Sequence, residues 1–205
     1  MSTSANDSEN VLFSSVHRSS WLWQLLQLTI DRPVIDYIVH CVSETVDQAL
    51  GRSDLPSSSN AAFTSFVSTV LVRSAETIAA VLTSLSYISR ARSNIYIPSI
   101  EWALERVFLG ALIVASKYTS DSTMKNVHWA ACTGIFSTRD ICRIEREFLA
   151  VLDWELAVSE GDLLAHHAGL ISATSNSNSR AARNHTRSHL KVPSSKTAPQ
   201  PKPPQ

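Results

Sequence analysis

Histidines and acidic residues are the side chains of this 205-residue chain whose types could support metal binding or acid–base chemistry. His166 and His167 are adjacent, and neighbours in sequence do not share a face of a helix, so they are poorly placed to bind one metal ion. His128 has no carboxylate at helical spacing. Further acidic residues are scattered, as expected for solvated caps and loops: Asp121, Asp153, Glu155 and Asp162. The sequence also lacks the GxGxxG, P-loop, HExxH and GxSxG motifs, so we predict no catalytic residue, no metal site and no cofactor.

Cysteine usage, together with the lack of a long apolar run or a secretory signal, predicts a protein inside the cell, and the charge is unevenly distributed along the chain. Cys41, Cys132 and Cys142 form no CxxC pair, and an odd number favours a reducing compartment over a disulfide framework. The net charge is zero, but residues 172–205 hold six basic and no acidic residues, which leaves 12 basic against 18 acidic residues in the body. No run of 18 apolar residues and no secretory signal are present, so we expect a soluble protein of the cytoplasm or nucleus.

The elements that must position any site are predicted to be helices. Hydrophobic residues make up 44% of the chain, enough for a core, and only 5 glycines are available for tight turns. We expect residues 1–30 to be mostly disordered, with Trp21–Ile30 forming either a short packed helix or a loop. Residues 31–51 form an amphipathic helix with Asp31 as its cap, Pro33 in its first turn and Gly51 after its end.

The main helical domain is predicted over residues 60–170, with five helices in order. The first is marked by apolar residues from Phe63 to Leu71, and the others cover about 75–90, from Pro98 to Ser116, 122–132 and 137–152. The third is apolar most of the way round and should be central. Ser137 and Asp140 resemble a capping box at the start of the last helix. Residues 171–205 lose apolar content and read as a disordered basic tail rich in Ser and Pro.

The stretch from Leu109 to Leu156 resembles the cyclin box, and more narrowly that of single-box fungal cyclins of the Pcl and Pho type. The resemblance covers about residues 60–160. No second box is visible after Leu170. The ordered set of short matches that carries the resemblance is Ala115-Ser116-Lys117-Tyr118, Asp121-Ser122, Asn126, His128-Trp129-Ala130, Phe136-Ser137, Arg143-Ile144-Glu145 and Leu152-Asp153-Trp154-Glu155-Leu156. It implies an all-α fold, a five-helix cyclin box with an N-terminal flanking helix.

The resemblance also implies a function and its residues. Cyclins bind and activate a cyclin-dependent Ser/Thr kinase, here of the Pho-type or cyclin-dependent-kinase-five-like class, in cell-cycle, polarity or nutrient control. The family's lysine and glutamate that lead the kinase contact match Lys117 and Glu145, which could otherwise form only an ion pair. The family's apolar contact positions match Val114, Tyr118, Leu149 and Trp154. We expect at least one of these four to belong to the core instead.

Departures from the family pattern leave a second function open. Thr119-Ser120 stands where an apolar residue and Asn are usual, and Cys142 stands where Asn is common. Asp121, Asn126 and Trp129 are expected to organise the turn between the third and fourth helices. The alternative function is a cyclin-fold adaptor in transcription, acting without a kinase and using the basic tail to contact nucleic acid. Six charges over 34 residues are modest, so we favour a solvated tail and expect neither nucleic-acid nor membrane binding.

Overall fold

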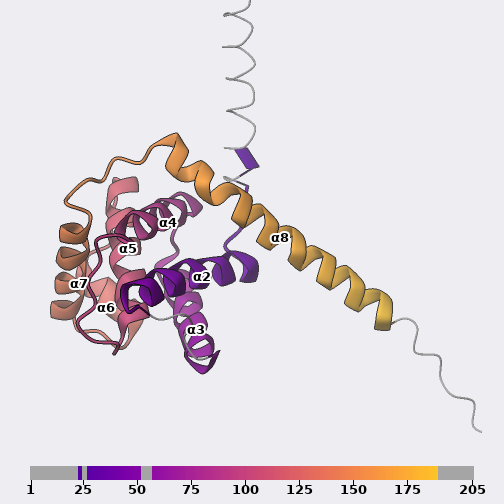
Figure 1. The fold of residues 1–205 in the computed structure, drawn as a ribbon, viewed down its shortest axis with the longest axis horizontal. Helices are drawn as coiled ribbons and strands as arrows, with labels where there is room; N and C mark the ends of the chain where they lie inside the picture. Colours follow the sequence, from indigo (N-terminus) through magenta and orange to yellow (C-terminus); the bar gives the residue numbers. More distant parts are fainter. Residues whose placement is uncertain (1–22, 25–26, 52–56, 189–205) are drawn as a thin grey trace, which may run out of the picture.

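The computed structural model describes residues 23–24, 27–51 and 57–188 of the chain. This part of the chain contains seven helices, labelled α2 to α8, and no strand. Figure 1 shows α2 to α7 gathered into one helical body, from which α8 extends. The all-α fold expected from the sequence is therefore confirmed. No helix in the described ranges is long and apolar enough to cross a membrane.

Helix α2 (Arg32–Ala49) begins and ends at the predicted signals. The Asp31 side chain accepts a hydrogen bond from the Val34 backbone N–H at 3.5 Å, and a proline occupies the first turn. Gly51 follows the helix with a φ of +63°, a left-handed conformation that costs glycine little. The apolar stripe of the helix lies in the core, with Ile38 and Val42 fully buried.

Five helices correspond to the segments predicted for the main domain. They are α3 (Ser57–Ser74), α4 (Ile78–Ala91), α5 (Ala103–Thr119), α6 (Asn126–Thr133) and α7 (Thr138–Val151). Ser137 and Asp140 form the predicted capping box of α7. Three starts differ from the predicted ones: α4 begins three residues after residue 75, α5 begins five residues after Pro98, and α6 begins four residues after Ser122. Before α5, Trp102 adopts a left-handed φ of +58° and packs its ring edge-on against Phe136, which turns the chain.

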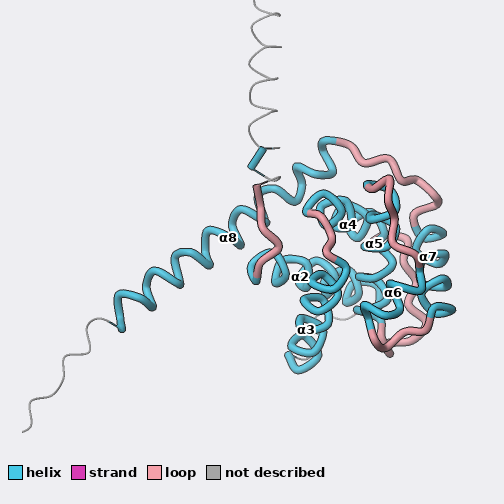
Figure 2. The backbone as a smooth tube through the Cα atoms, turned by 180° about the vertical axis from the view of Figure 1, so that it is seen from behind, coloured by secondary structure: helices cyan, strands magenta, loops and turns pink. Residues whose placement is uncertain are grey.

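Helix α5 lies at the centre of the body, as predicted. It contacts α2, α3, α4 and α7, and Ala111 and Ala115 are completely buried. Gly110 lets α7 come close, because a Cβ at this position would lie only 2.7 Å from the Cβ of Phe148. Figure 2 shows α5 between α4 and α7 from the opposite side of the molecule.

Helix α8 (Glu160–Ser188) was not predicted. Its first half packs on α2 and α4, where His166 is buried with one ring nitrogen 3.2 Å from the Tyr37 hydroxyl and the other 3.1 Å from the Ser89 hydroxyl. Burial lowers the pKa of His166, which favours the neutral ring.

The tail expected to be disordered from residue 171 is helical up to Ser188 in the structure. Loss of apolar residues indicates that a segment cannot form a core, but it does not prevent a helix. No glycine or proline interrupts residues 170–192, so the helix that starts on the body can continue past it. Residues 189–205 of the predicted tail, and residues 1–22 and 25–26 of the predicted N-terminal segment, lie outside the described part.

Candidate functional site

Lys117, Asn126 and Glu145 come together at the surface from three different helices. Lys117 is in the last turn of α5, Asn126 is the first residue of α6, and Glu145 is in the middle of α7. The ammonium of Lys117 lies 2.6 Å from Glu145 Oε1 and 2.8 Å from Asn126 Oδ1. Asn126 Nδ2 donates to Glu145 Oε2 at 2.7 Å, which closes a ring of three hydrogen bonds.

The ring is neither buried nor fully solvated. The side chains of Lys117 and Glu145 are 30% and 17% exposed. An ammonium has three donors, and only two are used within the ring. Each carboxylate oxygen of Glu145 accepts one hydrogen bond in the ring and has a second lone pair. The site can therefore offer a charged donor and a charged acceptor side by side to the backbone of another protein.

The four apolar positions matched to the family have very different exposures. Val114 is only 3% exposed and belongs to the core, as expected for at least one of the four. Leu149 is half-buried on α7. Tyr118 is 50% exposed and Trp154 is 65% exposed. The structure thus exposes two aromatic side chains, one next to Lys117 in α5 and one in the connection that follows α7, while Val114 is part of the core.

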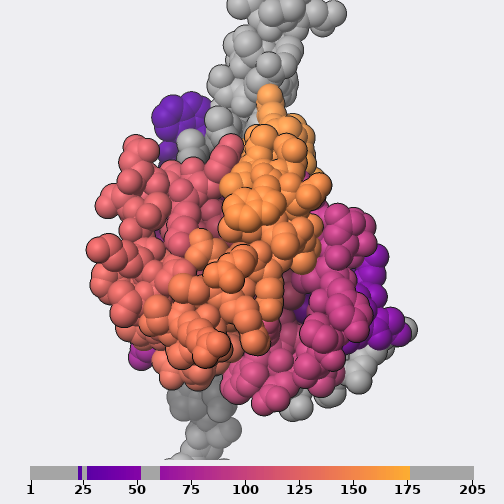
Figure 3. Space-filling model, turned by 90° about the vertical axis from the view of Figure 1, so that its left-hand side faces the viewer, coloured from indigo at the N-terminus to yellow at the C-terminus, as the bar shows by residue number. Residues whose placement is uncertain are grey.

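The connection between α7 and α8, residues 152–159, has an unusual backbone where it presents Trp154. Asp153 and Trp154 have φ angles of +50° and +59°, and a bulky residue in this left-handed region is rare. The N–H of Trp154 donates to the carbonyl of Leu149 at 3.0 Å. Such strain persists only where surrounding contacts over-determine it, and it gathers at functional sites. Figure 3 shows this side of the molecule, with the orange atoms of the connection and early α8 in its middle.

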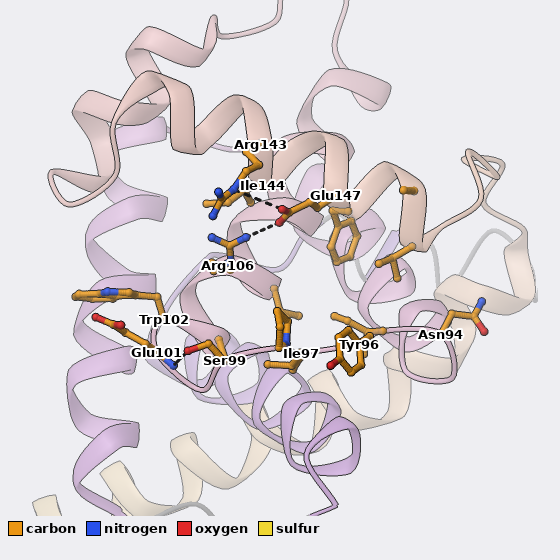
Figure 4. A pocket seen from close by; sticks show the side chains of 17 residues that line it. Asn94, Tyr96, Ile97, Ser99, Glu101, Trp102, Arg106, Arg143, Ile144 and Glu147 are labelled. Atoms are coloured by element: carbon orange, nitrogen blue, oxygen red, sulfur yellow. Dashed lines mark hydrogen bonds and ion pairs between the residues drawn. The ribbon is translucent and has the colours of Figure 1, made fainter.

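A concave surface lies on the side of α7 that faces away from the hydrogen-bonded ring. A groove of about 870 Å³ runs between the segment 94–103 and α7, as Figure 4 shows. Arg106 of α5 pairs with Glu147, which also lies 3.4 Å from Arg143. Glu147 follows Glu145 by two residues, which turns it about 200° around the helix. None of the residues predicted for kinase binding lines this groove.

Sequence reasoning missed part of the site. Asn126 was expected only to organise a turn, but it joins Lys117 to Glu145 and also lies 3.2 Å from Cys142 Sγ. The available signal was chemical, since an amide can accept from an ammonium and donate to a carboxylate at the same time. In the described ranges, no three His, Cys, Asp or Glu side chains converge as a metal site would require.

Comparison with known proteins agrees with this architecture. The sequence model of the cyclin N-terminal domain matches residues 40–157. The chain is 35% identical over 106 residues to PHO85 cyclin-2 of Saccharomyces cerevisiae, an alignment covering 49% of this chain and 34% of that protein. It is 26% identical over 155 residues to PHO85 cyclin-1 of the same yeast, covering 68% of this chain and 54% of that protein. PHO85 cyclin-9 of this yeast is 32% identical over 104 residues, covering 48% and 34%.

The alignments span between about a third and about half of the length of these curated relatives. The family match itself covers more than half of the present chain and includes α3 to α7 completely. Every helix that supplies the ring of Lys117, Asn126 and Glu145 lies within it. The chain therefore belongs to the cyclin family and is similar to its Pcl/Pho-type members.

Proposed function

We propose that this chain is a non-catalytic regulatory subunit that binds a cyclin-dependent Ser/Thr kinase of the Pho85 type and stabilises its active arrangement. The observation that carries the proposal is the partly exposed ring of Lys117, Asn126 and Glu145, with Tyr118 exposed next to Lys117 in α5 and Trp154 exposed just after α7. The names of the curated relatives, which contain both PHO85 and cyclin, support this class of partner. Such a role would be carried out in the cytoplasm, the nucleus or both.

The ring is better suited to binding a partner than an ordinary surface ion pair is. An exposed pair contributes about 0–1 kcal/mol to stability, and its long side chains remain mobile. Here Asn126 holds both charged groups, so less side-chain freedom remains to be lost when a partner binds. Lys117 would donate its third hydrogen bond to a backbone carbonyl of the kinase, and Glu145 would accept from a backbone N–H. Tyr118, Leu149 and Trp154 would supply the apolar contact around them.

Activation would then follow from selective binding. An active kinase needs its β3 lysine paired with the glutamate of its αC helix, and an isolated kinase subunit favours other arrangements. A rigid helical face that binds only the state with the αC helix packed inward shifts the population toward that state. The chain would contribute shape and hydrogen bonds in register, with no chemistry of its own.

Single substitutions at the ring test this proposal. Lys117→Ala and Glu145→Ala should each weaken binding to a purified Pho85-type kinase by about 2–5 kcal/mol, because each leaves desolvated polar groups of the partner unpaired. Calorimetry measures the affinity, and circular dichroism shows whether the helices are intact. Arg143→Ala is the matched control, since Arg143 is a charged residue of α7 that pairs with Glu147 on the opposite side. Binding by both ring variants at the level of the wild type, with the helices intact, would contradict the proposal.

A further inference from the structure

Two side chains of α4 hold the backbone of the connection that presents Trp154. Arg90 Nη1 donates to the carbonyl of Glu155 at 2.5 Å, and Nη2 donates to the carbonyl of Ala157 at 2.9 Å. Between these bonds, the Tyr87 hydroxyl donates to the carbonyl of Leu156 at 2.8 Å. Three successive carbonyl groups are thus bound by two residues that are three positions apart, on one face of α4.

The same guanidinium reaches the start of α8. Arg90 Nη2 lies 3.4 Å from Asp162 Oδ2, and Asp162 caps α8 by accepting from the backbone N–H of Ser159 at 2.8 Å. The Arg90 guanidinium also lies over the ring of Tyr87, 5.8 Å from its centroid. A planar guanidinium with five donors can serve two carbonyls and a carboxylate together, which a lysine ammonium cannot do with the same geometry.

Tyr87 connects this arrangement to the second exposed aromatic side chain. Its ring is buried and meets the ring of Tyr118 edge-on, with 6.4 Å between centroids. Tyr118 directly follows Lys117 in α5. Tyr87 and Arg90 therefore contact both segments that bring an aromatic side chain to the proposed kinase-binding surface.

We propose that Arg90, together with Tyr87, is a positioning residue for kinase binding, and this inference rests on the proposed function. The two residues hold the α7–α8 connection in the conformation that presents Trp154, and Arg90 acts through Trp154 without needing to touch the kinase. The left-handed backbone of Asp153 and Trp154 requires such external restraint. Without it the connection would populate other conformations, and the affinity would fall in proportion to the fraction that remains competent.

Hydrogen exchange in the free chain tests the restraint without any kinase. The amides of Trp154 and Glu155 donate to carbonyls of Leu149 and Leu152 at 3.0 Å, so their exchange reports on the connection. Arg90→Ala should accelerate exchange in peptides covering 152–158 while leaving those from α5 unchanged. Arg92→Ala is the matched control, because that arginine lies two residues further on and pairs with Glu44 of α2 at 2.9 Å. Equal exchange in both variants would overturn the inference.

A double-mutant cycle then tests whether the effect passes through Trp154. If about one Arg90→Ala molecule in ten keeps the connection in the binding conformation, its affinity for the kinase falls about tenfold. Arg90→Lys should not restore the affinity fully, because a lysine lacks the planar set of donors. In a chain that already carries Trp154→Ala, adding Arg90→Ala should lower the affinity for the kinase by about twofold or less.

The outcomes of the cycle separate two failures. The same loss from Arg90→Ala in both backgrounds, or full rescue by lysine, would overturn the positioning role while leaving the proposed function intact. A wild-type chain that fails to bind the kinase would instead refute the proposed function, and this inference with it.

Discussion

Two ion pairs join α5 to α7, and the comparison between them shows how the candidate site differs from an ordinary surface contact. Glu145 pairs with Lys117 near the end of α5, and Glu147 pairs with Arg106 near its beginning. The two glutamates are two residues apart and point to opposite sides of α7, so they reach opposite ends of α5. We call Lys117 and Glu145 the inner pair, and Arg106 and Glu147 the outer pair. Asn126 binds both members of the inner pair, whereas Glu147 of the outer pair also interacts with the solvated Arg143.

The difference teaches that partial burial, and an amide that binds both charged groups, matter more than the ion pair itself. Glu145 is mostly shielded from solvent and each of its oxygens is bound, so its orientation is fixed. Glu147 is 53% exposed and Arg143 is 62% exposed, so water competes for their charged groups and weakens the ion pair between them. The inner pair is consequently suited to setting the register of a partner, and the outer pair to keeping the rim of the groove solvated.

The largest effect expected on folding stability comes from separating the two helices that carry both pairs. Gly110 lies on the same face of α5 as Arg106 and Lys117, and a Cβ there would clash with Phe148 at 2.7 Å. Gly110→Ala should lower the free energy of unfolding by about 1–3 kcal/mol, because the packed interface must shift. Urea unfolding followed by circular dichroism measures the loss. A midpoint equal to that of the wild type would show that α5 and α7 tolerate separation and that neither pair depends on their close approach.

A smaller effect is expected from removing only the third member of the inner site. Asn126→Ala keeps Lys117 and Glu145 but frees both side chains, so kinase binding should weaken by about 1–2 kcal/mol, less than after losing either charge. Calorimetry against the kinase measures this difference. Asn94→Ala, an exposed asparagine lining the groove on the other side of α7, is the control and should bind normally. Equal affinity for the two variants would mean that Asn126 has no part in ordering the site.

The smallest effect is expected at the outer pair. Glu147→Ala should change the free energy of unfolding by about 0–1 kcal/mol, and the change should shrink at 1 M salt, because exposed charges are screened. Thermal unfolding at low and high salt measures both values. A loss above about 2 kcal/mol that persists at high salt would show that the pair of Arg106 and Glu147 is held as firmly as that of Lys117 and Glu145.

Local signals in the sequence predicted most helices because they act within one or two turns. Asp31 before Pro33 and Ser137 before Asp140 supply side chains that bind the first free N–H groups of α2 and α7. Pro98 carried the same kind of signal for α5, but the helix begins only at Ala103. Trp102 and Phe136 are 34 residues apart in the sequence, so no local rule could anticipate their contact or the turn that it stabilises.

The candidate site likewise has one part that the sequence indicated and one part that only the structure shows. The resemblance of the sequence to cyclins selected Lys117 and Glu145 and implied that Lys117 ends the third box helix and that Glu145 lies on the fifth. Only the packing of three helices could show that Asn126 closes the ring between them. Nothing in the sequence distinguished buried from exposed among the four apolar positions, yet Val114 is buried and Trp154 is exposed.

By itself, the sequence determined the helical class, the order of the main helices and the caps of α2 and α7, and it indicated the two charged residues of the candidate site. Each of these depends on neighbours a few positions away, or on a motif that is continuous in the chain. The tertiary structure decided which side chains meet and which face solvent. Arg90 and the carbonyl of Glu155 are 65 residues apart and meet only because α4 and the connection after α7 pack together. Spacing along one helix specifies a face, but the neighbour on that face is set by packing in three dimensions.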